Sequence, residues 1–122
     1  MSAKNSDISR KDTNSRMSEI VVFNKMVYLA GQVPSSTDKD MKGQAGETLA
    51  EIERMLLAAG TDKSRILMAT VYILDFKEFA AFNEVWEAWV EPGHTPARAT
   101  VEVSRLADPG WKIEIAVTAA MP

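Results

Sequence analysis

The stretch TPARATVEV, residues 95–103, carries the clearest strand pattern of the chain. Proline fixes the backbone at the end of a loop, and small apolar residues then alternate with polar ones, as they do along a β-strand. Arg98 therefore stands at the beginning of a predicted strand. Its planar guanidinium suits a carboxylate, so Arg98 is a candidate anchor for a small organic acid. The alternative is an exposed strand arginine in a weak surface ion pair.

The stretch ILMATVYIL, residues 66–74, is apolar at nearly every position, which is typical of a central strand covered on both faces. A helix is predicted before it over Met41–Ala59, where apolar residues recur three and four positions apart. Asp40 or a neighbour supplies the amino-terminal cap and Gly60 the carboxyl-terminal stop. A second helix is predicted after it, over residues 76–90, with Asp75 as its cap.

Further strands are predicted at both ends of the chain. Residues 19–23 and 26–33 form a hairpin, and residues 112–119 form the last strand. The strand, helix, strand order from residue 26 to residue 74 predicts a crossover onto a parallel partner. The sequence therefore predicts an α+β fold of the split βαβ type, with a mixed sheet of about six strands and two helices packed on one face.

We predict one domain over residues 16–122, preceded by a flexible amino-terminal arm over residues 1–15, in which Ile8 is a possible start of an edge strand. Two helices cover only one face of the sheet, so the other face is expected to meet another subunit. By alternation we expect Arg98, Glu102 and Glu114 all to lie on this uncovered face.

Composition excludes several classes of protein. The chain has 122 residues, a net charge of -3 and scattered basic residues, so no nucleic-acid or membrane footprint is expected. It has no cysteine, which excludes disulfides, thiolate nucleophiles and zinc-thiolate sites. No signal-peptide core or bilayer-spanning run is recognisable, and we expect a cytoplasmic protein.

The inventory of reactive side chains is short. The single histidine, His94, lies in a Pro/Gly loop, and without cysteines it makes no convincing metal site or catalytic triad. No phosphate-binding glycine loop is present. No metal or cofactor is therefore expected. Arg98 and Glu114 remain as the candidates for acid–base and electrostatic catalysis. Asn83 falls beside the apolar stripe of its helix and is either a packing amide or part of a pocket wall.

Seven short segments of the chain form a recognisable set: Ala30–Pro34, Ala58–Gly60, Val71–Asp75, Phe79–Asn83, Pro96–Arg98, Val101–Val103 and Lys112–Ile115. In order and spacing these segments resemble the RidA (YjgF) family, formerly labelled endoribonuclease L-PSP. The resemblance extends from about Arg16 to Ala120. It implies a chorismate-mutase-like fold, a homotrimer with sites in the clefts between subunits, and cofactor-independent hydrolysis of reactive 2-imino or enamine acids to 2-keto acids and ammonia.

The resemblance also implies roles for individual residues. Arg98 would bind the substrate carboxylate and Glu114 would hold the attacking water, with Glu102 remaining an alternative to Glu114. Gly31 and Thr100 would line the pocket, and Asn83 would lie at its edge.

The chain departs from the family pattern at three positions: Met17 replaces a pocket tyrosine, Ala30 a serine, and Thr100 a cysteine. Met17 slightly favours a second hypothesis, a non-catalytic module that binds or senses small acids. A third, ribonuclease or translation-inhibiting activity, is disfavoured by the acidic charge balance.

Overall fold

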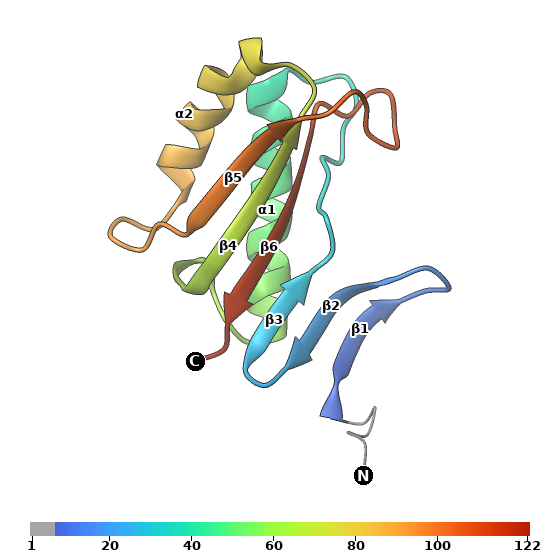
Figure 1. Ribbon diagram of the computed structural model, residues 1–122, viewed down its shortest axis with the longest axis vertical. Helices are drawn as coiled ribbons and strands as arrows, with labels where there is room; N and C mark the ends of the chain where they lie inside the picture. The colour runs from blue at the N-terminus through green and yellow to red at the C-terminus, as the bar shows by residue number, and fades with distance from the viewer. Residues whose placement is uncertain (1–6) are drawn as a thin grey trace.

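The strands form one six-stranded sheet in the computed structural model, which describes residues 7–122 (Figure 1). The order across the sheet is β1-β2-β3-β6-β4-β5. Only β4 and β5 pair in parallel, and all other neighbours are antiparallel. The strands are β1 (Ser9–Thr13), β2 (Ser18–Phe23), β3 (Met26–Leu29), β4 (Ile66–Ile73), β5 (Ala97–Glu102) and β6 (Ile113–Ala120), and the helices are α1 (Met41–Ala59) and α2 (Phe79–Trp89).

The topology confirms the α+β prediction of a split βαβ arrangement. β6 is antiparallel to both β3 and β4, so β3 and β4 run parallel with β6 inserted between them. The crossover through α1 therefore does not join neighbouring strands, whereas the crossover through α2 joins the parallel neighbours β4 and β5. In Figure 1, α1 lies behind β4 and β6 and α2 lies beside β5, and neither helix covers the front face of the sheet.

The ends of α1 follow the sequence signals. The Asp40 side chain accepts a hydrogen bond from the backbone N–H of Gly43 at 2.9 Å, and Gly60 ends the helix in the left-handed region with φ 98°. The apolar stripe predicted for α1 is buried in a core that also includes Phe82 and Trp86 of α2. From α1 this core contains Met41, Ala45, Leu49, Ile52, Met55, Leu56 and Ala59.

Two element boundaries differ from the prediction. A short 3-10 turn, Phe76–Glu78, precedes α2, because Asp75 caps the N–H of Lys77 at 2.8 Å. β3 ends at Leu29, and pairing with β6 resumes only at Gln32, which faces Ile115. Since Tyr28 faces Thr118, four steps along this segment match three along β6, so a bulge lies around Gly31.

The amino-terminal segment contains an edge strand. β1 is exposed at every residue and pairs with β2, so the edge strand that was expected to begin near Ile8 is present within the predicted arm. Residues 1–6 of that arm lie outside the described residues. Among residues 7–122, neither helix combines the length and apolarity needed to cross a bilayer.

The loop before α1 is tied to the helix through Glu47, and this contact makes stability depend on pH. Lys39 Nζ and Ser36 Oγ donate to Glu47 Oε2 at 2.8 and 2.9 Å, and Ser36 N donates to Oε1 at 3.0 Å. The Lys39 hydrogen bond, followed by those of Ser36, lowers the pKa of Glu47 to about 2. A lowered folded-state pKa stabilises the protein above the unfolded-state pKa, and that contribution is lost as the pH falls through the folded-state value.

We therefore expect Glu47→Gln to unfold at lower urea concentration than the wild type at pH 7. The difference should shrink as the pH falls below the ordinary carboxyl range and disappear only below about pH 2, where both chains become neutral at this position. Glu84→Gln, which removes an exposed ion pair with Lys42, is the matched control and should have a smaller effect at pH 7. Equal losses in the two variants would contradict the role given to Glu47.

Candidate functional site

Arg98 lies near the start of β5 and points toward the helices. It pairs with Ala69 of β4, a fully buried core residue, and its guanidinium carbon lies 5.7, 5.3 and 5.2 Å from the ring centroids of Phe79, Phe82 and Trp86. These distances are within the range of cation–π attraction. Three rings of α2 therefore hold one half-buried cation in a defined direction.

The charge of Arg98 is not neutralised within the chain. None of the four ion pairs found among residues 7–122 includes Arg98. Burial lowers the pKa of its guanidinium from the usual value, and the more distant charge of Glu87 only partly opposes this. Because an arginine remains protonated in proteins, Arg98 is a desolvated cation that is available to an external carboxylate.

Thr100 lies on the same face as Arg98, since it pairs with buried Val71 of β4. Its Oγ1 is the one buried side-chain polar atom among residues 7–122 that has no hydrogen-bond partner. A buried hydroxyl without a partner costs free energy, and such groups call for an explanation.

Glu114 lies on β6 and is half-buried on the uncovered face of the sheet. Its carboxylate rests against Gly31: a Cβ added to Gly31 would collide with Glu114 Oε2 and lie 2.9 Å from Cδ. Burial raises the pKa of Glu114 above its usual value. The bulge at Gly31 thus makes room for a carboxylate that is easier to protonate than an exposed one.

The prediction that Arg98 and Glu114 share one face of the sheet is wrong. Through β4, Arg98 is in register with Ala69 and Val117, whereas Glu114 is in register with Tyr72 and therefore lies on the opposite face. The expectation assumed that the small apolar residues of β5 face the core. In the structure they are exposed on the uncovered face, and the polar residues of β5 turn toward the helices.

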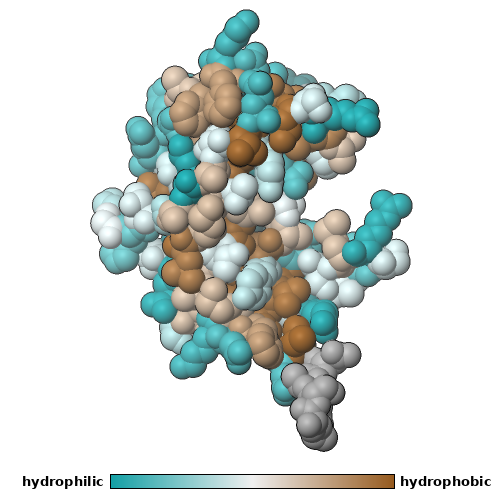
Figure 2. Space-filling model, in the orientation of Figure 1, coloured by the Kyte–Doolittle hydropathy of each residue, from teal (hydrophilic) through white to brown (hydrophobic). Residues whose placement is uncertain are grey.

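The uncovered face is apolar across its middle, as Figure 2 shows in the same view. Met68 of β4 and Val101 of β5 are 38% and 40% exposed on it, beside exposed Ala97 and Ala99. We refer to these four residues as the β4–β5 patch. β5 is also an edge strand, paired on one side only, so Arg98 lies beside a free edge of the sheet.

The remaining candidate residues are placed as follows. Glu102 lies on the Arg98 face and accepts a hydrogen bond from the N–H of Phe76 at 2.9 Å, so it is already engaged in a structural contact. This leaves Glu114 as the better candidate for holding water. Asn83 is half-buried on α2, next to Phe82, and Met17 is 50% exposed just before β2.

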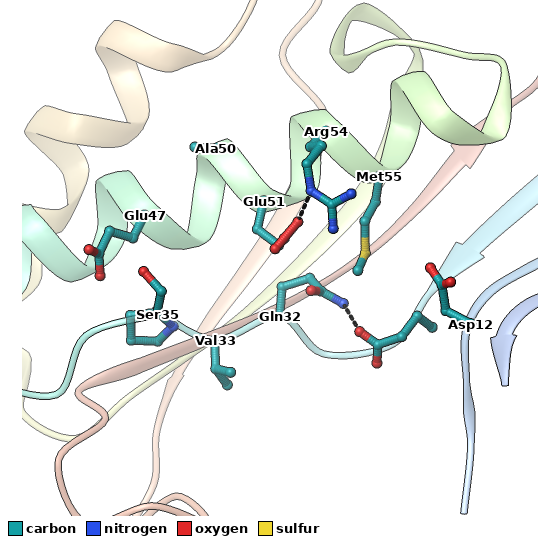
Figure 3. Close-up of a pocket in the computed structure, with 11 residues that line it drawn as sticks. Asp12, Gln32, Val33, Ser35, Glu47, Ala50, Glu51, Arg54 and Met55 are labelled. Atoms are coloured by element: carbon teal, nitrogen blue, oxygen red, sulfur yellow. Dashed lines mark hydrogen bonds and ion pairs between the residues drawn. The ribbon is translucent and has the colours of Figure 1, made fainter. Parts of the chain in front are cut away.

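A hollow of about 850 Å³ between α1 and the amino-terminal strands contains none of the predicted site residues (Figure 3). Its charged groups are largely engaged with neighbours: Arg54 with Glu51, and Glu19 with Gln32. Among residues 7–122, no three metal-ligating side chains are grouped closely enough to hold a metal ion. The hollow is lined by Asp12, Glu19, Gln32, Val33, Pro34, Ser35, Glu47, Ala50, Glu51, Arg54 and Met55.

Comparison with known proteins agrees with this architecture. The family model described as Endoribonuclease L-PSP matches residues 8–121. A RutC family protein of Haemophilus ducreyi is 46% identical over 114 residues, which cover 93% of this chain and 97% of that protein. The RutC family protein YoaB of Escherichia coli is 42% identical over 114 residues, covering 93% and 98%. A crystal structure of a YjgF-family protein from Neisseria meningitidis is 41% identical and superposes with a TM-score of 0.92 over 98% of each chain.

The molecule is thus a small α+β protein whose helices cover one face of a mixed sheet and whose candidate polar groups lie on both faces. The chain belongs to the Endoribonuclease L-PSP family, also called the RidA/YjgF family.

Proposed function

We propose that this protein hydrolyses reactive 2-imino or enamine acids to 2-keto acids and ammonia. The observation that carries the proposal is Arg98, a half-buried cation held by three aromatic rings and lacking an ion-pair partner among residues 7–122. Such a group suits the carboxylate of a small organic acid, which it would bind through two parallel hydrogen bonds. Thr100 lies two residues further along β5 on the same face.

Glu114 supplies the acid–base chemistry. As the water oxygen attacks the carbon of the protonated imine, the carboxylate accepts one water proton and a neutral carbinolamine forms. Glu114 then passes that proton to the amine nitrogen, the C–N bond breaks and ammonia leaves, while the Glu114 carboxylate accepts the hydroxyl proton as the carbonyl forms. Ammonia carries this proton away as ammonium, which restores the ionised Glu114. Burial raises the pKa of Glu114, which suits both the proton transfer from water and the proton transfer to nitrogen, because the carboxyl group exchanges a proton more readily near neutral pH.

The proposed site is shared between subunits. Arg98 and Glu114 lie on opposite faces of one sheet, so a single substrate held by both requires the two groups to come from different copies. The exposed β4–β5 patch and the free edge of β5 provide surfaces for such contact. We propose a homotrimer, the assembly implied by the family resemblance, acting without a cofactor and located in the cytoplasm.

The test is release of ammonia and keto acid from imino acids generated in situ by an amino-acid oxidase. Small, aliphatic and aromatic substrates should be compared, because the preferred side chain is open. The wild type should accelerate hydrolysis, and Glu114→Gln should lose the acceleration while keeping its fold by circular dichroism. No acceleration with any imino acid would refute the enzymatic proposal.

A non-catalytic acid-binding module is the second candidate. It is favoured by Met17, which is 50% exposed just before β2 and has a thioether where the family pattern has a phenol hydroxyl. Binding of 2-oxobutanoate without imine hydrolysis would identify this function. RNA binding that weakens with salt would instead support the ribonuclease hypothesis.

Gly31→Ala should lower the rate without unfolding the protein. The added methyl group would occupy the space of the Glu114 carboxylate, which must then move away from its position over the bulge. Because the displaced group is the end of a flexible side chain, we expect a small change in melting temperature and a loss in kcat of about tenfold or more. Gly46→Ala, where an added Cβ meets nothing within 4 Å, is the matched control and should leave the rate unchanged. Equal rates in the two variants would count against Glu114 acting from this position.

A further inference from the structure

Tyr72 lies directly opposite Glu114 across the β4–β6 pair. The two residues face each other in register, both are half-buried, and both belong to the uncovered face. Side chains paired in this way have Cβ atoms about 5 Å apart. The phenol and the carboxylate therefore project side by side from adjacent strands.

The other neighbours of Glu114 at this level are apolar or bare. Gly31 lies against the carboxylate and has no side chain, and Val101 lies on the far side of Tyr72 on β5. The Tyr72 hydroxyl makes no hydrogen bond within residues 7–122. Of these three neighbours, Tyr72 alone brings a free polar group to the acid.

We propose that the Tyr72 hydroxyl is a third functional group of the site and holds the attacking water together with Glu114. The water donates one hydrogen bond to the Glu114 carboxylate and accepts one from the Tyr72 hydroxyl, which leaves its second lone pair for the imine carbon. Tyr72 neither gains nor loses a proton, so the proton balance of the hydrolysis is unchanged. This inference rests on the proposed deaminase function.

The only other tyrosine of the chain, Tyr28, serves as the control. It lies on the same face but on β3, which β6 separates from β4, and it pairs with Thr118, four residues along β6 from Glu114. Tyr28→Phe is therefore a matched control for Tyr72→Phe, since each substitution removes one oxygen and keeps the ring. We expect kcat to fall about tenfold or more in Tyr72→Phe, the size of one lost hydrogen bond to a charged or reacting group, and to stay unchanged in Tyr28→Phe.

The pH profile separates a functional hydroxyl from a packing ring. Glu114 must be ionised to accept the water proton, and a phenol that donates into the same hydrogen-bond network favours the ionised form. Removing the Tyr72 hydroxyl should make Glu114 harder to ionise. The acid limb of kcat/KM should therefore move to higher pH in Tyr72→Phe and not in Tyr28→Phe. A change in packing alone would alter the melting temperature and leave the limb in place.

A binding measurement completes the test. In Tyr28→Phe the phenol of Tyr72 is the only one in the chain, so the change in ultraviolet absorbance when 2-oxobutanoate binds should be larger in Tyr28→Phe than in Tyr28→Phe/Tyr72→Phe, where only the tryptophans respond. The proposal is overturned if Tyr72→Phe keeps the wild-type rate and acid limb while Glu114→Gln is inactive, or if the two variants show the same absorbance change when calorimetry shows the keto acid bound. A wild type that hydrolyses no imine removes the deaminase function itself, and this inference with it.

Discussion

Arg98→Ala should abolish accelerated imine hydrolysis and weaken 2-oxobutanoate binding on the order of a hundredfold, the effect of losing two charge-assisted hydrogen bonds to a carboxylate. The fold should survive, because Arg98 makes no ion pair among residues 7–122 and lies on an edge strand. The measurements are steady-state ammonia release and isothermal calorimetry with the keto acid. Retention of wild-type affinity would refute the role of Arg98 as carboxylate anchor.

Arg98→Lys distinguishes the guanidinium from its charge. A lysine keeps the positive charge but cannot make two parallel hydrogen bonds to one carboxylate, so we expect partial recovery of binding and little recovery of rate.

Tryptophan fluorescence offers an independent measure of binding at Arg98. Because the guanidinium lies 5.2 Å from the ring centroid of Trp86, binding of an anion to Arg98 should change the tryptophan fluorescence in the wild type and not in Arg98→Ala.

The sequence predicted the architecture well because its signals were local. The caps Asp40 and Gly60 and the apolar spacing of α1 follow from contacts within a few residues along the chain, and the structure confirms all of them. The split βαβ order also follows from the succession of elements. The bulge at Gly31 was not predicted, since it depends on how β3 and β6 pair across more than 80 residues of sequence.

The alternation of residues along β5 was not enough to predict which face of the strand meets the helices. Alternation shows that Arg98 and Ala99 point to opposite sides of β5, but not which side meets the helices. The cross-strand register with Ala69 decides this, and it depends on long-range pairing. Phe82 and Trp86 belong to the apolar stripe of the second predicted helix, yet nothing local indicated that their rings would also contact a cation. The candidate residues were therefore predicted individually, while their division between two faces was not.

That division leads to the prediction with the clearest outcome: two inactive variants should restore activity when they assemble together. In a mixed oligomer, an Arg98 from a Glu114→Gln copy can meet a Glu114 from an Arg98→Ala copy. Random mixing in equal amounts should make about a quarter of the sites intact, since each of two independent positions is correct half of the time. Copies should be co-expressed with different tags, and hybrids purified before the assay; in hybrid trimers freed of the two pure assemblies, about one site in three should be intact.

The control replaces the Glu114→Gln partner with the double variant Arg98→Ala/Glu114→Gln. No copy in that mixture carries Arg98, so no intact site can form and activity should stay absent. Activity confined to the first mixture would establish that one substrate contacts two chains, because Arg98 and Glu114 of a single chain lie on opposite faces of its sheet. If purified hybrids of the first mixture remained inactive, Arg98 and Glu114 would have to act within one chain or not together, and the shared site would be excluded.

Ala99→Asp tests the same shared site through the assembly itself, because it places a charge in the β4–β5 patch. We expect this variant to elute as a smaller species than the wild type on size-exclusion chromatography. It should also lose hydrolysis, since neither face of an isolated copy carries both Arg98 and Glu114.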